Sequence, residues 1–138
     1  MNRQDYQKSI ISSLTWPSTQ VSVNNKLNLT DINVHSENFY RDLLNLAFGY
    51  NLVNINIIDP NAAAIDLGDE GHKFAIQVTS TSALTKTRHT VTKFIEKGLH
   101  KKYDRLVILN ITAKTAHTAP TVGDDTYSLN TKDDIWDI

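Results

Sequence analysis

Hydrophobic residues recur with helical spacing in three parts of the chain, and each part predicts an amphipathic helix. These parts are residues 3–14, Thr30 to Phe48, and Ser82 to Lys97. Gly49 and Gly98 directly follow the second and third parts, in positions where a glycine commonly ends a helix. The pair Trp16-Pro17 follows the first part and is expected to stop it.

Four other segments carry apolar, β-branched runs that predict β-strands. They are Leu52 to Ile58, Ala63 to Leu67, Lys73 to Thr79, and Arg105 to Ile111. The second and third are separated by a Gly-Asp-Glu-Gly turn and are expected to form a hairpin. Tyr127 to Leu129 can add an edge strand, whereas residues 112–125 hold no clear element. The apolar residues among the last six, 133–138, are expected to lie exposed where a module of a longer protein ends.

The order of these segments predicts one α/β domain with a mixed sheet. A single sheet of the four strand segments would bury the apolar stripes of the two longer helices. The chain has 138 residues, enough for one core, and no cysteine, which excludes disulfides, thiol nucleophiles and zinc–thiolate sites. No apolar run approaches the roughly 18 residues of a membrane span, and the N-terminus is too polar for a signal peptide. We therefore expect a cytoplasmic protein that does not bind a membrane.

The formal net charge of −1 hides a basic segment. Residues 86–114 carry eight Lys and Arg against two acidic residues. Lys86, Lys93 and Lys97 fall opposite the apolar stripe of the third helix, and Lys101 and Lys102 follow it. Such a cationic face can follow a phosphate backbone, which makes these lysines candidate nucleic-acid contacts. A lysine-rich face that is merely solvated is the alternative.

The predicted hairpin places oxygen ligands together. If its loop consists of Glu70 and Gly71, Asp66 lies opposite Ala75 and shares a sheet face with Gln77 and Thr79. A carboxylate and an amide oxygen in that position can hold a hard divalent cation. A turn-capping aspartate is the alternative for this acid.

Glu37 is a second candidate acid. It lies at the border of the apolar stripe of the second helix, from where its side chain can reach over the sheet. The alternative is a glutamate that simply favours the first turns of a helix.

Several strings resemble known families. The order of helix, strand, hairpin and helix is similar to the core of the PD-(D/E)XK nuclease superfamily. The string NLTDINVHSENFYRDLLNLAFGY, together with AIDLGDE and IQVTS, resembles the bacterial SMEK domain, from about residue 3 to the end. The resemblance implies a restriction-endonuclease-like sandwich with a central mixed sheet flanked by helices. It also implies that residues 1–138 are a single nuclease-like domain, the N-terminal module of a longer bacterial protein, with anti-phage defence among the roles of such proteins.

The resemblance assigns roles to particular residues. Asp66 takes the place of the first metal-binding acid, Glu37 that of the helix acid, and Gln77 stands where a second acid is usual. Thr79 occupies the position of a lysine that would orient the attacking water. The implied cofactor is Mg²⁺ or Mn²⁺, and the implied substrate is DNA.

The missing lysine leaves alternatives open. Lys73 shares the parity of Gln77 on the predicted strand, and Lys86 or Lys93 can reach in from the following helix. The leading expectation is a Mg²⁺-dependent DNA endonuclease. Its competitor is a catalytically inactive nuclease-fold module that binds nucleic acid or docks other domains of the full-length protein. A homo-oligomer is compatible with either.

Overall fold

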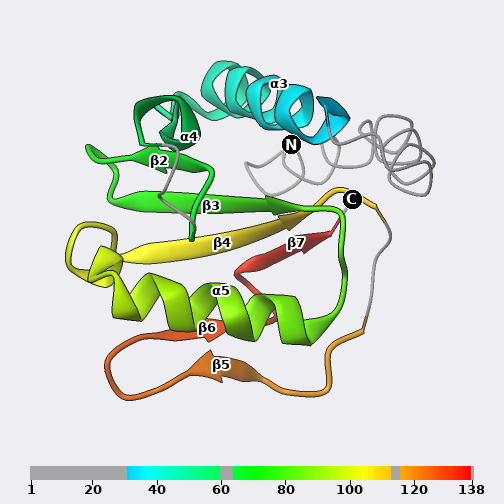
Figure 1. The fold of residues 1–138 in the computed structure, drawn as a ribbon, viewed down its shortest axis with the longest axis vertical. Helices are drawn as coiled ribbons and strands as arrows, with labels where there is room; N and C mark the ends of the chain where they lie inside the picture. The colour runs from blue at the N-terminus through cyan, green and yellow to red at the C-terminus, as the bar shows by residue number, and fades with distance from the viewer. Residues whose placement is uncertain (1–30, 60–63, 113–115, 138) are drawn as a thin grey trace, which may run out of the picture.

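The computed structural model describes residues 31–59, 64–112 and 116–137. In this part of the chain a five-stranded mixed sheet is flanked by helices, with strand order β1-β2-β3-β4-β7 (Figure 1). The mixed α/β architecture predicted from the sequence is therefore confirmed. The helix predicted for residues 3–14 lies outside the described residues, as does the start of the strand predicted from Ala63.

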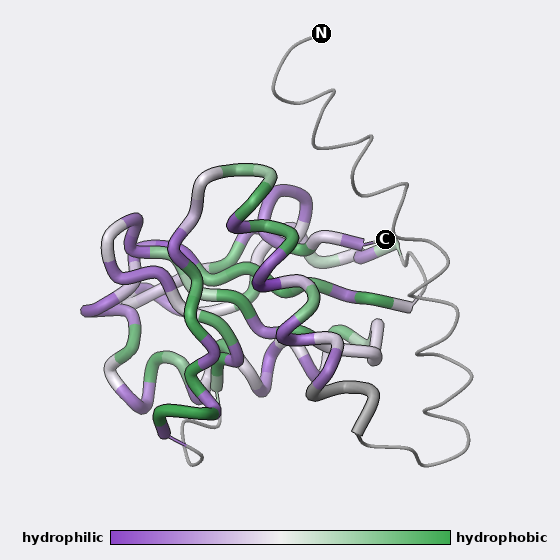
Figure 2. The backbone as a smooth tube through the Cα atoms, turned by 90° about the horizontal axis from the view of Figure 1, so that it is seen from above, coloured by the Kyte–Doolittle hydropathy of each residue, from purple (hydrophilic) through white to green (hydrophobic). Residues whose placement is uncertain are grey.

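The sheet combines an antiparallel and a parallel half. Its strands are β1 Val53–Asn54, β2 Leu67–Asp69, β3 Phe74–Thr79, β4 Arg105–Asn110 and β7 Ile135–Asp137. Strands β1, β2 and β3 pair antiparallel, while β4 pairs parallel with both β3 and β7. The two central strands run through the interior as largely hydrophobic segments (Figure 2), as expected for strands covered on both faces.

Two of the predicted helices are confirmed almost to the residue. They are α3 Asp31–Phe48 and α5 Leu84–Glu96. Gly49 and Gly98 follow them with φ of 69° and 68°, a left-handed conformation that glycine adopts without steric cost. A short 3-10 helix, η1 Leu99–Lys101, follows the second of these glycines.

The two helices cover opposite faces of the sheet. Tyr40 and Leu44 of α3 belong to a buried cluster with β2 and β3 residues such as Leu67 and Ile76. Phe94 of α5 belongs to a second cluster. Its other members include residues of β3, β4 and a separate two-stranded sheet, β5 Thr121–Gly123 and β6 Ser128–Asn130. Figure 1 shows α5 and this small sheet on the same side of the main one.

The strand predicted for Leu52 to Ile58 is wrong beyond its second and third residues. Only Val53–Asn54 is extended, and a four-residue helix, α4 Ile55–Ile58, follows. Asn54 causes the change, because its side-chain oxygen accepts a hydrogen bond from the backbone N–H of Asn56 at 3.0 Å and caps the helix. Ile57 and Ile58 are each 71% exposed. A strand at these residues would therefore gain no packing against the described part of the chain, and their preference for β-structure has no effect.

The predicted hairpin forms, but its first strand covers Leu67–Asp69 rather than Ala63 to Leu67, and its register differs by two residues. Ala75 faces Gly68 rather than Asp66, and the loop consists of residues 70–73. The Asp69 carboxylate organises this longer turn by accepting hydrogen bonds from the backbone N–H of His72 at 3.0 Å and of Asn51 at 2.7 Å. A shift of two residues preserves the side-chain parity of both strands.

The C-terminal part is more ordered than the sequence suggests. The expectation of exposed apolar residues at the end of the chain is wrong for Ile135, which is 8% exposed and belongs to β7. The predicted edge strand at Tyr127 to Leu129 corresponds to β6, which pairs with β5 rather than with the main sheet. Strand β5 lies in residues 112–125, where no element was expected. The sequence does not indicate this strand, because only its central residue Val122 is buried and so short a run shows no periodicity.

Candidate metal and phosphate site

A cleft of about 210 Å³ opens where β3 ends, between residues of α3 and α5. Most of the candidate catalytic residues line it. They are Glu37 from α3, Asp66 just before β2, Gln77 and Thr79 from β3, and Lys86 from α5. The structure thus brings together side chains that lie up to 49 positions apart in the sequence, from Glu37 to Lys86.

Asp66 is the most buried acid of the cleft, with 8% of its surface exposed. Its Oδ2 atom accepts a hydrogen bond from the backbone N–H of Val78 at 2.9 Å, and its Oδ1 atom accepts one from Nδ2 of Asn56 at 2.9 Å. Burial raises the pKa of Asp66 despite these hydrogen bonds and the nearby charge of Lys86, which act in the opposite direction. The carboxyl group therefore has a fixed orientation, and the positive charge around it does not offset the cost of its burial.

Glu37 meets Asp66 in this cleft. Its Oε2 atom accepts hydrogen bonds from the side-chain amides of Asn56 at 3.2 Å and Asn54 at 3.4 Å. Burial, followed by the negative charge of Asp66, raises the pKa of Glu37. Two half-buried or buried carboxyl groups, one of which makes the ionisation of the other more costly, form the kind of site at which a bound cation is favourable.

Asn54 and Asn56 are the site residues that sequence reasoning missed. Asn54 is buried, and its Nδ2 atom also donates to Oδ1 of Asn38 at 3.0 Å. The signal is present in the sequence, because Asn-Ile-Asn interrupts an apolar run with two amides. A strand at this place would put both amides on one sheet face, whereas with the cap at Asn54 both amides contact the acids.

Thr79 does not perform the role of a lysine. Its hydroxyl accepts a hydrogen bond from the backbone N–H of Thr81 at 3.1 Å and donates to the carbonyl of Thr81 at 3.4 Å. The side chain is 7% exposed. It therefore stabilises the turn that leads from β3 toward α5. Gln77 is half-buried at the same end of β3, and its Nε2 atom donates to the carbonyl of Val78 at 3.3 Å.

The structure distinguishes between the three lysines considered as substitutes for the lysine that Thr79 replaces. Lys73 lies in the hairpin turn before β3, with φ of 53°. Four residue steps along β3, about 13 Å at 3.3 Å per residue, separate it from Gln77, the first residue of the strand that lines the cleft. Lys93 forms an ion pair with Glu96 at 3.3 Å farther along α5. Lys86 lines the cleft itself, and its charge acts to lower the pKa of Asp66.

The cleft offers only a few charged groups to a cation, and its oxygen atoms suit a hard one. No group of three or more His, Cys, Asp and Glu capable of holding a metal occurs among the described residues. The donors available are the carboxylates of Glu37 and Asp66 and the amide of Gln77, with Asn56 between the two acids. Rotation of the Asn56 amide by half a turn would present its oxygen in place of its nitrogen. Such an all-oxygen set suits Mg²⁺ or Mn²⁺.

The basic residues lie at the surface, as an interface with a polyanion requires. The set comprises Lys86, Lys93, Lys97, Lys101 and Lys102, the first three on α5 or directly after it. The helix buries Val91 and Phe94 against the sheet. Two of the lysines have acidic partners, because Lys102 pairs with Glu70 at 2.7 Å in addition to the pair of Lys93.

Comparison with known protein families identifies a family for this chain. The family model described as the SMEK domain matches residues 9–138. No curated protein and no solved structure matches the chain. Within the residues described, none of the helices has the length and apolar character needed to cross a membrane.

Proposed function

The chain belongs to the SMEK domain family, and we propose that it is a nuclease domain of the restriction-endonuclease-like fold that hydrolyses DNA with Mg²⁺. One observation carries this proposal. Two carboxyl groups from separate elements, Glu37 and Asp66, converge in a cleft that also holds the amide of Gln77 and the cation of Lys86. These are the group types needed to hold a divalent ion beside a phosphodiester.

Each residue has a defined part in this proposal. Asp66 and Glu37 hold the ion through carboxylate oxygens, and Gln77 contributes its amide oxygen. Bound Mg²⁺ would supply Lewis acidity toward the phosphate and lower the pKa of a coordinated water. The backbone N–H of Val78 fixes the Asp66 carboxyl group. Lys86 provides a positive charge for the scissile phosphate, the contribution that Thr79 lacks.

The basic side chains indicate the path that a bound nucleic acid would follow over the surface. Lys93 and Lys97 continue from Lys86 along α5 and its C-terminal end, and Lys101 and Lys102 follow. Interactions with phosphate oxygens position a nucleic acid without reading its bases. We therefore propose sequence-independent binding along this face. Roles in a longer bacterial protein and in anti-phage defence rest on the sequence resemblance alone.

The decisive experiment measures metal binding and cleavage in parallel. Calorimetric titration with Mn²⁺ should show one site in the wild-type protein, and affinity should fall at least about tenfold in Asp66→Asn, with a smaller loss in Glu37→Gln. Cleavage of plasmid and single-stranded DNA should be lost in Asp66→Asn. The matched control is Asp42→Asn, which removes an exposed acid on the same helix as Glu37. Equal Mn²⁺ affinity in Asp66→Asn and Asp42→Asn would contradict the proposal.

The hydrogen-bonding groups around Glu37 and Asp66 favour a second function. The Asn56 amide donates to both carboxyl groups, and the Thr79 hydroxyl is engaged with Thr81. This arrangement suits a catalytically inactive module that binds nucleic acid or docks other domains. DNA binding that needs no Mn²⁺, from a protein that neither binds the ion nor cleaves, would establish this alternative over the nuclease.

A further inference from the structure

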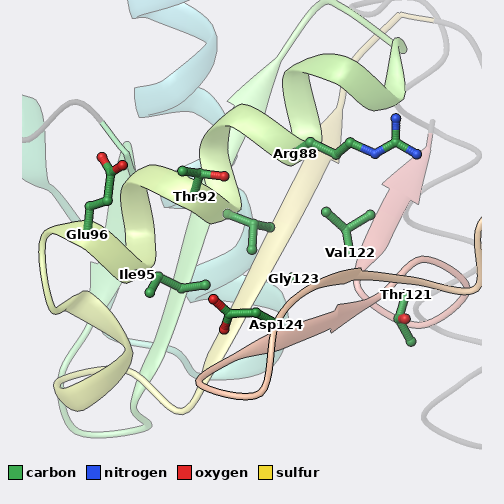
Figure 3. A pocket seen from close by; sticks show the side chains of 9 residues that line it. Arg88, Thr92, Ile95, Glu96, Thr121, Val122, Gly123 and Asp124 are labelled. Atoms are coloured by element: carbon green, nitrogen blue, oxygen red, sulfur yellow. The ribbon is translucent and has the colours of Figure 1, made fainter.

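A groove of about 570 Å³ outside the candidate site also contains two acids, but both already have partners. These acids are Glu96 of α5 and Asp124, which follows β5, and in Figure 3 the Glu96 carboxylate points away from Asp124. Glu96 pairs with Lys93 at 3.3 Å, and the Asp124 carboxylate accepts a hydrogen bond from the backbone N–H of Thr126 at 2.8 Å. The preference for a cation therefore has to be sought in the candidate metal site itself.

The Glu37 carboxylate in that site is held by one of its two oxygen atoms. The side-chain amides of Asn54 and Asn56 both donate to Oε2, at 3.4 Å and 3.2 Å. Because a carboxylate oxygen offers about two lone-pair positions, these two donors occupy Oε2. The oxygen that Glu37 can offer to an ion is therefore Oε1.

The orientation of the Asn54 amide is fixed at both of its ends. Its Oδ1 atom accepts a hydrogen bond from the backbone N–H of Asn56, and its Nδ2 atom donates to Oδ1 of Asn38, each at 3.0 Å. Arg41 donates to that same Asn38 oxygen at 3.0 Å, and a guanidinium group can only donate. Asn54 therefore keeps its N–H directed at Glu37 even when the Asn56 amide rotates toward an ion.

Asp66 is restricted in a similar way. Its Oδ2 atom accepts a hydrogen bond from the backbone N–H of Val78 at 2.9 Å, which leaves Oδ1 beside Asn56 to face an ion. The two acids thus offer one oxygen each. Mg²⁺ is commonly bound through one or two carboxylates and keeps several waters, whereas Ca²⁺ takes about six to eight oxygens and often binds both atoms of a carboxylate.

We propose that Asn54 is a positioning residue that makes the cleft selective for Mg²⁺ and Mn²⁺ over Ca²⁺. Its hydrogen bond to Oε2 restricts Glu37 to a single coordinating oxygen. Coordination of Ca²⁺ by both oxygens of Glu37 would break that hydrogen bond, whereas coordination of Mg²⁺ or Mn²⁺ by Oε1 preserves it. This inference rests on the proposed metal site at Glu37 and Asp66, and it adds the discrimination between ions.

The test compares the Mn²⁺ and Ca²⁺ affinities of the full chain by calorimetric titration. The wild type should bind Mn²⁺ more tightly than Ca²⁺. Asn54→Ser retains a side-chain oxygen that can cap α4 but lacks the amide that donates to Glu37. The ratio of Mn²⁺ to Ca²⁺ affinity should fall about threefold to tenfold in this variant, the equivalent of one hydrogen bond. A change that only loosened the fold would weaken the binding of both ions and leave the ratio unaltered.

A second variant leaves the buried Asn54 in place. Asn38→Ala removes the oxygen that fixes the Asn54 amide and puts a good helix former on α3. It should lower the ratio in the same direction, by less than Asn54→Ser. The matched control is Asn45→Ala, because Asn45 also lies on α3 but exchanges its two hydrogen bonds with the backbone of Leu52. This control should leave the ratio as in the wild type.

The outcomes separate the selectivity from the metal site itself. If Asn54→Ser and Asn38→Ala bind both ions with the wild-type ratio, the selectivity proposal is overturned and the metal site stands. An equal fall of the ratio in Asn45→Ala would also overturn it, because general loosening of α3 would then be the cause. A wild-type chain that binds neither ion would overturn the proposed function, and the selectivity with it.

Discussion

The side-chain amide of Asn56 donates a hydrogen bond to Oδ1 of Asp66 at 2.9 Å. The same nitrogen lies 3.2 Å from Oε2 of Glu37, so one amide supplies partial positive charge to two carboxyl groups. A divalent cation between these acids would offer the same oxygens a full charge. Asn56 therefore occupies the place where amide stabilisation and metal binding compete.

Replacing this amide by a third carboxylate tests that competition. Asn56→Asp should increase Mn²⁺ affinity about tenfold or more, because an added carboxylate strengthens an oxygen site. Without metal the variant should be less stable by about 1–3 kcal/mol, since a hydrogen-bond donor is replaced by a like charge. Calorimetry and melting curves with and without Mn²⁺ measure both effects. Ser128→Asp, at an exposed position of β6, is the control and should leave both quantities unchanged.

The acids of the cleft also predict a pH dependence of folding. The pKa of Asp66 is raised above its ordinary value of about 3.9, mainly by burial. A carboxyl group with a raised folded-state pKa stabilises the fold below its unfolded pKa and loses that contribution as pH rises through the folded value. The stability of Asp66→Asn relative to the wild type should therefore increase as pH rises from about 4 through the raised folded-state pKa. Urea unfolding at several pH values checks the sign in metal-free buffer.

Asp69 should give the opposite pH dependence of stability in the same unfolding experiment. Burial alone would raise its pKa, but hydrogen bonds from the backbone N–H groups of Asn51 and His72 and from the His72 ring lower it. Its contribution is present above about pH 3.9 and is lost as pH falls through the lowered folded value. Asp69→Asn should cost about 1.5–3 kcal/mol at pH 7 and progressively less in acid. Parallel pH profiles for the Asp66 and Asp69 variants would refute both assignments.

Gly68 makes a packing prediction at the hairpin. A Cβ atom added there would lie 2.5 Å from the hydroxyl oxygen and 3.0 Å from Cζ of Tyr103. Tyr103 is 1% exposed and has little room to move. Gly68→Ala should therefore destabilise the fold by about 1–3 kcal/mol. In a double-mutant cycle, Tyr103→Phe should recover part of this loss, whereas additive effects would mean that the two residues do not clash.

The helices and central strands could be predicted because their signals are local and repeated. The 3.6-residue period of α3 and α5 and the continuous apolar run of β4 each rest on many residues. The strand at Leu52 to Ile58 was wrong because one side chain, the Asn54 cap, outweighs the propensity of its neighbours. The hairpin register was wrong because the Asp69 carboxylate stabilises a turn longer than the glycines suggest.

The candidate site was predictable in its acids but not in their surroundings. Side-chain parity placed Asp66 with Gln77 and Thr79, and this parity survived the change of register. The border position on α3 allowed Glu37 to reach over the sheet, and the family resemblance assigned both acids to one site. Which lysine accompanies them depends on the crossing of α5 over the end of β3, a tertiary relationship that periodicity does not contain. The structure selects Lys86 over Lys73 and Lys93 on that ground.

The basic face of α5 yields a prediction that separates nucleic-acid binding from solvation. Lys93→Glu, Lys97→Glu should leave the melting temperature nearly unchanged, because both side chains lie at the surface while Val91 and Phe94 are buried. Affinity for duplex DNA should fall strongly, measured by fluorescence anisotropy at several salt concentrations. The slope of log affinity against log salt should flatten by roughly 0.9 for each phosphate that is no longer neutralised, because fewer counterions are released.

The control for this prediction is Lys132→Glu, which changes net charge at a distant turn without touching α5. If the double reversal and this control reduce DNA affinity equally, only the overall charge matters, and α5 is not the interface. If both leave affinity and slope unchanged, the lysines are a solvated helix face. A decrease confined to the double reversal, equal for unrelated DNA sequences, would mean that α5 binds phosphates and reads no bases.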